Sequence, residues 1–117
     1  MKILVPLLVV LMVFLMVWAA NVIYCDNLTA KHYDEFTTCA EDMNRIWWNI
    51  VGWKVLKYSN DYAEVYFYCE TDGKLDGGVV VAYQKNGESW DKLRELASWS
   101  KHGSASDGVW PYHPIWY

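Results

Sequence analysis

The hydrophobic and polar residues of the chain divide it into a long apolar segment and a patterned remainder. No charged residue lies between Lys2 and Asp26, and the segment Ile3–Ala20 is apolar throughout. A membrane-spanning helix needs about 17–25 such residues, whereas the apolar core of a signal peptide has about 7–15. At about 1.5 Å per residue the segment spans roughly 27 Å, close to the thickness of a bilayer's hydrocarbon core. Its length therefore favours a membrane anchor.

A cleaved signal peptide is the alternative. The sequence Val17-Trp18-Ala19 places acceptable residues at positions −3 and −1 of a cleavage site after Ala19. Residues 1–25 are thus predicted to be an anchor, contacting the membrane through residues 3–20, or a signal peptide. Residues 26–117 are predicted to form one small α+β domain, since that length suffices for one hydrophobic core.

The charges beside the apolar segment predict its orientation. Its positive flank is N-terminal, at Lys2, whereas Asp26, Asp34 and Glu35 follow on the other side. Positive flanks tend to stay in the cytoplasm, so we expect the domain outside it, in a periplasm, a lumen or the extracellular space. If the segment is cleaved, the domain is secreted.

The residues that follow predict an amphipathic helix over about 30–51. The sequence DNLT at residues 26–29 is typical of a helix start, with Asn27 or Thr29 as the capping residue, and Gly52 closes the helix. Apolar residues recur at spacings of three and four, which is the period of one helix face. They are Tyr33, Phe36, Cys39, Met43, Ile46, Trp47 and Ile50.

The pattern then changes to the alternation of strands. Residues 53–58 and 62–69 flank a short turn at 59–61, and a loop over 70–78 leads to a third strand over 79–84. In the second strand the apolar residues Ala63, Val65, Phe67 and Cys69 share one face, which we expect the helix to cover.

Residues 88–100 fit two structures. Trp90, Leu93, Leu96 and Ala97 have helical spacing, but the turn signal Asn86-Gly87 before them favours a hairpin. We favour a fourth strand through Trp99. The tail at about 101–117 is rich in Gly and Ser and then in aromatic residues and Pro, so no long regular element is expected there.

The elements together predict an α+β fold. After the transmembrane or signal helix, one amphipathic helix packs on a three- to four-stranded antiparallel meander. This order of elements resembles the cystatin-like and NTF2-like topologies, and such a likeness implies no function.

The net charge and the aromatic content of the chain limit the kinds of partner that it can bind. The chain has 10 basic and 14 acidic residues, a net charge of −4, which argues against nucleic acid because nucleic-acid-binding proteins present a basic surface. It also has 8 Trp and 9 Tyr against 3 Phe. Tyr and Trp combine a large apolar ring with a polar tip, which suits half-buried sheet faces and membrane interfaces.

The three cysteines predict at most one disulfide. Cys39 lies on the helix face that should meet the sheet, and Cys69 on the sheet face that should meet the helix. A Cys39–Cys69 bridge would stabilise the domain by about 3–4 kcal/mol and leave Cys25 unpaired or paired with another chain. The alternatives are a Cys25–Cys69 pair, or two reduced cysteines buried in the core.

No catalytic, cofactor-binding or metal-binding residues are predicted. His32, His102 and His113, with Asp107, lack the spacing of a metal site, and no cysteine has a neighbouring base in a recognisable arrangement. We therefore expect a non-enzymatic protein without a cofactor.

Aromatic residues are the candidate interaction surface. Tyr62, Tyr66 and Tyr68 form the outward stripe of the second strand, and the tail adds Trp110, Tyr112, Trp116 and Tyr117. This surface could bind a protein, stack on a sugar or rest on a membrane. Alternatively, the tail folds back over the sheet and buries the stripe.

The sequence thus predicts a membrane-anchored or exported small domain that binds a protein partner or serves as a subunit of a membrane complex. The alternative is a secreted, disulfide-stapled inhibitor or effector released by cleavage near Ala19. A carbohydrate-binding or enzymatic module that uses the aromatic face is the third hypothesis.

Overall fold

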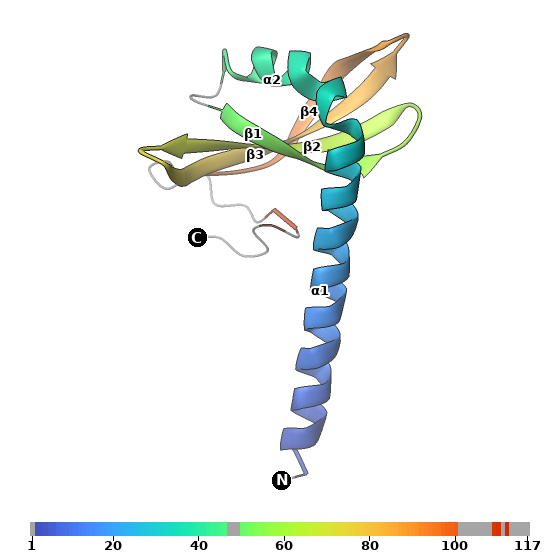
Figure 1. Ribbon diagram of the computed structural model, residues 1–117, viewed down its shortest axis with the longest axis vertical. Helices are drawn as coiled ribbons and strands as arrows, with labels where there is room; N and C mark the ends of the chain where they lie inside the picture. The colour runs from blue at the N-terminus through green and yellow to red at the C-terminus, as the bar shows by residue number, and fades with distance from the viewer. Residues whose placement is uncertain (1, 47–49, 101–108, 111, 113–117) are drawn as a thin grey trace.

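The computed structural model has an α+β fold in which one long apolar helix precedes a four-stranded antiparallel sheet (Figure 1). It describes residues 2–46, 50–100, 109, 110 and 112. The elements are α1 (Leu4–His32), the 3-10 helix η1 (Tyr33–Phe36), α2 (Thr37–Met43), β1 (Ile50–Tyr58), β2 (Tyr62–Thr71), β3 (Lys74–Asn86) and β4 (Ser89–Ser100).

The first helix has two parts with different surroundings. Its side chains from Leu4 to Val17 are exposed, and its most apolar 18-residue window has a mean hydropathy of 2.5. Length and composition allow it to cross a membrane and equally fit a signal sequence. Further along, Cys25 and Thr29 are buried against the sheet. One continuous helix therefore joins the apolar segment to the domain.

The predicted helix over 30–51 is wrong in both of its bounds. The DNLT sequence lies inside α1, where the Thr29 hydroxyl donates to the Cys25 carbonyl instead of capping a helix. At the other end α2 stops at Met43, and Ile50 already belongs to β1. The apolar spacing nonetheless identified core residues, because Phe36, Cys39 and Met43 are all buried.

The four strands form a simple meander in the order β1-β2-β3-β4, as predicted. The segment 88–100 is a strand, as we favoured, and it follows a tight turn at Gly87. The predicted loop over 70–78 is instead a two-residue turn with strand on both sides. Asp72 and Gly73 both have positive φ, at 55° and 76°, the geometry of a primed hairpin turn.

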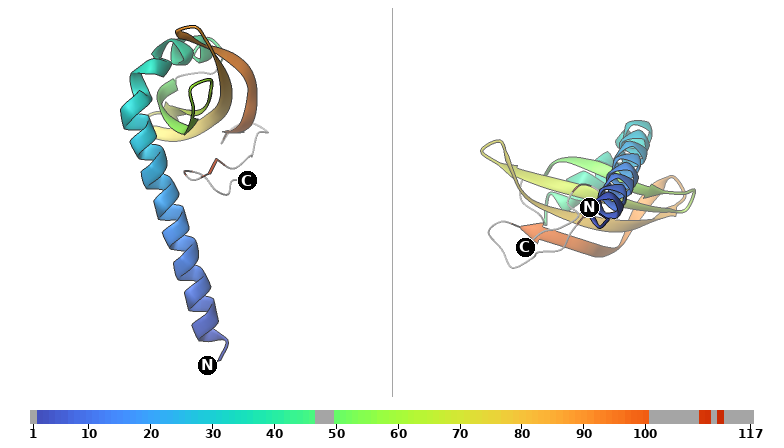
Figure 2. Two further views of the ribbon diagram at one scale, coloured as in Figure 1. Left: turned by 90° about the vertical axis from the view of Figure 1, so that its right-hand side faces the viewer. Right: turned by 90° about the horizontal axis from the view of Figure 1, so that it is seen from below.

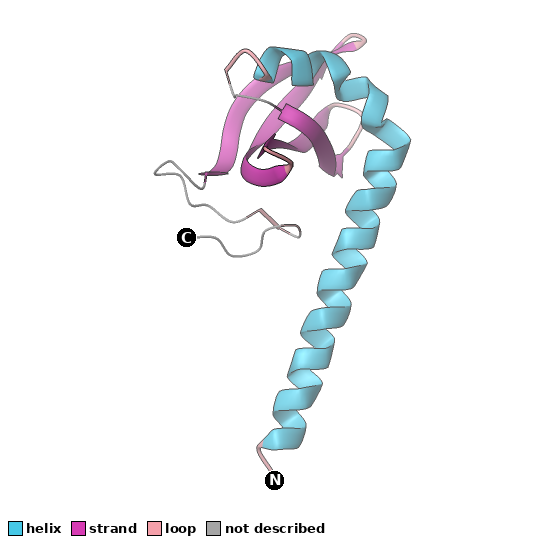
Figure 3. Ribbon diagram, turned by 60° about the vertical axis from the view of Figure 1, so that its left-hand side comes forward, coloured by secondary structure: helices cyan, strands magenta, loops and turns pink. Residues whose placement is uncertain are grey.

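The short helix α2 and the described tail residues lie on opposite faces of the sheet. Figure 1 and Figure 3 show α2 above the sheet, while α1 runs past the β1 edge and projects away on the other side. Figure 2 shows that the strands curl strongly. Of the described tail residues, Val109 is buried on the sheet face that carries Tyr66 and Trp99.

Each face of the sheet has its own hydrophobic core. On the helix face, Phe36, Cys39 and Met43 pack against Val65 and Phe67, so the predicted apolar face of β2 is covered as expected. On the other face, the buried residues are Tyr66, Val80, Trp99 and Val109.

Candidate functional site

The tyrosines of β2 lie on the sheet face opposite α2. Tyr66 is buried and its hydroxyl accepts a hydrogen bond from the Trp99 indole at 3.0 Å, whereas Tyr62 and Tyr68 are half-buried. The tail reaches this face: Val109 is buried in the same core, and the Tyr112 ring stacks on the Tyr66 ring at 6.3 Å. Part of the predicted stripe is thus covered by the chain itself.

Asp26 at the base of the domain ties the tail to α1. The Tyr112 hydroxyl donates a hydrogen bond to its carboxylate at 2.5 Å, and the Lys54 ammonium contacts the same oxygen at 3.2 Å. The Tyr112 hydrogen bond is the main cause that lowers the pKa of Asp26. Burial first, and then the Asp26 carboxylate, raises the pKa of Tyr112. Both groups therefore keep the protonation states that the hydrogen bond requires.

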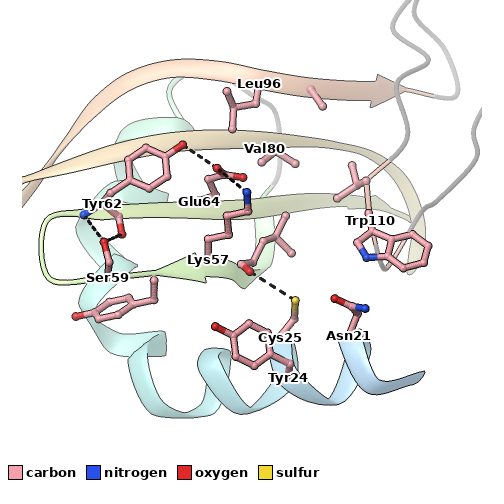
Figure 4. A pocket seen from close by; sticks show the side chains of 14 residues that line it. Asn21, Tyr24, Cys25, Lys57, Ser59, Tyr62, Glu64, Val80, Leu96 and Trp110 are labelled. Atoms are coloured by element: carbon pink, nitrogen blue, oxygen red, sulfur yellow. Dashed lines mark hydrogen bonds and ion pairs between the residues drawn. The ribbon is translucent and has the colours of Figure 1, made fainter. Parts of the chain in front are cut away.

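A cavity of about 750 Å³ lies between α1 and this face of the sheet. Figure 4 shows Asn21, Tyr24 and Cys25 on the helix side and Val80 and Leu96 across from them. We call this cavity the α1 groove. Its walls are Asn21, Tyr24, Cys25, Leu56, Lys57, Tyr58, Ser59, Tyr62, Glu64, Val80, Leu96, Ala97, Val109 and Trp110.

The rim of the α1 groove exposes large apolar side chains. Tyr24 is 55% exposed, Trp110 41% and Leu96 38%, although each borders a concave surface. Tyr24 lies four residues beyond the end of the apolar segment Ile3–Ala20. The groove therefore begins where α1 leaves that segment.

Polar side chains also line the α1 groove, and several of them have hydrogen-bond or ion-pair partners. The Tyr62 hydroxyl donates to the Glu64 carboxylate at 2.7 Å, and the Lys57 ammonium lies 3.7 Å from the same carboxylate (Figure 4). The Cys25 thiol donates to the Leu56 carbonyl at 3.7 Å. Burial, followed by the nearby Asp26 charge, raises the pKa of Cys25, so it is a protonated donor and not a thiolate.

A second cavity of about 430 Å³ lies on the same face, toward the turn between β2 and β3. It is lined by Lys54, Tyr66, Tyr68, Glu70, Gly73, Leu75 and Tyr112. Two of the predicted surface tyrosines, Tyr66 and Tyr68, line this cavity and not the α1 groove. The tyrosine stripe is thus divided between two concave sites.

A polar cluster on the helix face surrounds Glu35. The Tyr58 hydroxyl donates to one carboxylate oxygen at 2.6 Å, and the His32 Nδ1 lies 2.6 Å from the other. The His32 and Tyr58 rings stack at 3.5 Å, and Lys85 lies 3.9 Å from Glu35. Burial pushes the pKa of Glu35 upward, but hydrogen bonds from Tyr58, His32 and Trp90 outweigh it and lower that pKa. The cluster holds the end of α1 against β1.

The structure does not form the predicted Cys39–Cys69 bridge: all three cysteines are free. Cys39 contacts Tyr83 and the Trp90 carbonyl, and Tyr83 pairs with Ala63 near the start of β2. Cys69 lies six residues further along that strand, which corresponds to about 20 Å. A disulfide needs Cα atoms within about 7 Å, so sharing a face did not bring these residues together.

The cysteines behave as small buried residues, the alternative that the sequence left open. Burial raises the pKa of Cys39 and of Cys69 to about 11, so both thiols are protonated at neutral pH. Within the described residues, no group of three or more His, Cys, Asp or Glu side chains is placed to hold a metal. His102, Asp107 and His113 lie outside those residues.

Of the seven predicted surface residues, the structure brings Tyr62 and Trp110 to the α1 groove, and Tyr66, Tyr68 and Tyr112 to the second cavity. Trp116 and Tyr117 lie outside the described residues. Sequence patterns predicted no binding role for Leu56, Leu96 or Ala97, because only the packing of α1 beside the sheet makes them groove residues. Alternation along β1 would have placed Leu56 on the strand face opposite the buried Val55, but it does not reveal a groove there.

Comparison of the chain with models of protein families, with curated proteins and with solved structures finds no match. The likeness to cystatin-like and NTF2-like topologies therefore remains one of element order.

Proposed function

We propose that the chain is a membrane-anchored domain, displayed outside the cytoplasm, that binds a protein partner through the α1 groove. The observation that carries this proposal is the position of the groove: it lies between α1 and the sheet, at the end of the apolar segment. A partner in the same membrane would meet it without leaving the bilayer surface.

The course of α1 supports an anchor. Its apolar part is exposed to the surroundings, whereas Cys25 and Thr29 are built into the domain. Exposed aliphatic side chains over such a length are costly in water and favourable in lipid. Because the helix continues without a break into the domain, an anchored chain would hold the domain close to the bilayer.

Flanking charge supports the orientation. Lys2 precedes the apolar segment, and the exposed acid Asp26 is the first charge after it. Under the positive-inside rule this arrangement keeps the N-terminus in the cytoplasm and displays the domain on the other side.

The rim of the α1 groove supports a protein partner. Protein interfaces are enriched in aromatic residues such as Tyr and Trp, and Tyr24 and Trp110 expose such rings at the rim of the groove. The partner that fits is an apolar, membrane-proximal segment of a second membrane protein. Confinement of both proteins to one membrane raises their effective concentration, so a small interface suffices.

The chemistry of the groove favours binding over catalysis. Its single carboxylate, that of Glu64, accepts a hydrogen bond from the Tyr62 hydroxyl and forms an ion pair with Lys57. Its thiol, that of Cys25, is protonated because its pKa is raised. A nucleophile would need a lowered pKa or a neighbouring base, and the groove side chains supply neither to Cys25.

Site-specific photocrosslinking in native membranes tests this proposal. A photoreactive residue is placed at Leu96, on the groove rim, or at Leu93, an exposed leucine of the same strand that does not line the groove. We expect a discrete protein adduct from position 96 and none from position 93. The substitution Ala97→Trp, which fills the groove, should abolish that adduct.

Equal labelling from positions 93 and 96, or an adduct from position 96 that survives Ala97→Trp, would contradict the groove as the binding site. The folded state of each variant is checked by thermal unfolding in detergent, because Ala97 packs against the core that contains Trp99.

A further inference from the structure

Trp110 lies beside the apolar part of α1. Its ring meets the Phe14 ring edge-on, with centroids 6.3 Å apart and planes at 65°. Phe14 lies within the apolar segment Ile3–Ala20, six residues before its end. A residue of the C-terminal tail thus contacts a residue of the membrane-crossing segment.

The tail holds Trp110 in that place through its neighbours. Val109 is buried in the core formed by Tyr66, Val80 and Trp99. The Tyr112 hydroxyl donates a hydrogen bond to the Asp26 carboxylate at 2.5 Å, and its ring stacks on the Tyr66 ring. Because both neighbours are fixed to the domain, ordering the indole at a bilayer costs little additional entropy.

The depth of this contact matches a membrane interface. Six helical residues correspond to about 9 Å along the axis, so Phe14 lies about that far below the end of the apolar segment. Amphipathic elements at bilayer surfaces bury their apolar side about 5–10 Å into the boundary between headgroups and acyl chains. Trp is enriched at this boundary because its large ring is apolar and its indole N–H is polar.

We propose that Trp110 is a second point of membrane attachment, inserted at the headgroup–acyl boundary of the outer leaflet beside α1. This inference rests on the anchored state proposed above. The partner is the lipid interface itself, not an anionic headgroup, since the chain is acidic and Tyr112, two residues after Trp110, is hydrogen-bonded to the Asp26 carboxylate.

Two attachments would fix the orientation of the domain. A single helix leaves the domain free to tilt about the bilayer normal, whereas a second contact beside it removes one tilt direction. Trp110 also lines the α1 groove, so its insertion would hold the groove at a constant height above the lipid. The groove would then be presented only to partners that lie in the same membrane.

Depth-dependent quenching in the full-length chain tests this inference. A small fluorescent amino acid replaces Phe14, Trp110 or Leu93 in turn, and the protein is reconstituted in phosphatidylcholine vesicles that contain spin-labelled lipids. Leu93 is the control, since it is exposed on β4, which Figure 1 places at the end of the molecule away from the N-terminus. We expect lipid quenching to remove most of the emission at positions 14 and 110 and almost none at 93.

Emission at position 110 that is quenched by aqueous iodide, as at position 93, with position 14 still quenched by lipid, would overturn the second attachment and leave the anchor intact. Lack of lipid quenching at position 14 would contradict the anchor, and with it both proposals.

A near-native variant gives a second readout if the fluorescent replacement at 110 unfolds the chain. The emission difference between the wild type and Trp110→Phe isolates the contribution of this indole. Insertion predicts that this difference is blue-shifted and is lost with spin-labelled lipids. A difference spectrum typical of an indole in water, unchanged by those lipids, would overturn the inference.

Discussion

The Thr29 hydroxyl accepts a hydrogen bond from the backbone N–H of Val55 at 2.8 Å and donates one to the Cys25 carbonyl at 2.7 Å. Thr29 belongs to α1 and Val55 to β1, which is an edge strand of the sheet. An edge strand has unpaired backbone groups that must find partners when they are buried. The Thr29 side chain thus accepts a hydrogen bond from a backbone N–H of the edge strand and joins α1 to the sheet.

Replacing Thr29 tests the contribution of this hydrogen bond to stability. Thr29→Val keeps the shape of the side chain and leaves the buried Val55 N–H without its acceptor, which should cost about 1–3 kcal/mol of unfolding free energy. The measurement is chemical unfolding of the full chain in detergent. Thr38→Val is the matched control, since Thr38 is exposed on α2, and it should change stability by less than about 0.5 kcal/mol. Equal effects of the two variants would show that α1 is held by other contacts.

The carboxylate of Glu35 should make stability depend on pH. Its folded-state pKa is lowered, so it stabilises the fold fully above its unfolded pKa, about 4.3, and less as the pH falls through the lower folded value. Stability measured from pH 7 downward should therefore decline in the acid range. Glu35→Gln should remove part of that decline.

At neutral pH, Glu35→Gln should cost about 1 kcal/mol, a figure discounted because the side chain is partly solvent-exposed. Glu41→Gln, an exposed change of the same type on α2, should leave both the stability and its pH dependence unaltered. If the acid decline persists unchanged in Glu35→Gln, the cluster around Glu35 does not contribute to it.

Two glycines beneath tyrosine rings should respond differently to the same substitution. A Cβ at Gly78 would clash with the ring of Tyr66, and one at Gly52 with the ring of Tyr68. Tyr66 is buried and its hydroxyl accepts a hydrogen bond from the Trp99 indole, whereas Tyr68 is half-buried and can move. Gly78→Ala should therefore cost about 1–3 kcal/mol and Gly52→Ala less. Thermal unfolding of both variants checks the ranking, and the reverse order would show that the ring over Gly78 is free to shift.

Cysteine alkylation tests the absence of a bridge. All three thiols are buried and free, so the folded chain should resist alkylation at pH 8, and denaturation without reductant should expose three reactive thiols to mass analysis. A single alkylation under those conditions would show a disulfide and would restore the bridge that the sequence favoured.

Most of the fold followed from periodicity. The strands were predictable because residues such as Val65 and Phe67 alternate with tyrosines, and Asn86-Gly87 marks a hairpin by its preference for positive φ. The Asp72-Gly73 turn carries the same signal, but it lies within the segment 70–78 that we expected to be one loop. Ile50 was assigned to a helix because its spacing from Ile46 fits either period, and only pairing with Cys69 decides for the strand.

The candidate site was less predictable. Alternation predicted that the β2 tyrosines share one face of the sheet, and the tail residues Val109 and Tyr112 fold onto that face. The α1 groove depends on where a straight helix passes a curled sheet, which is a tertiary relationship without a local signature. The same holds for the contact of Phe14 with Trp110, since these residues lie far apart in the sequence.

The central claim is that the apolar part of α1 is retained as an anchor, and the intact mass of the protein from native membranes tests it most directly. The membrane fraction is washed with alkaline carbonate, solubilised and measured without proteolysis. The account predicts a membrane-bound chain that still contains residues 1–19. A soluble product that has lost those residues, as cleavage after Ala19 would give, would contradict the anchor and support a secreted inhibitor or effector.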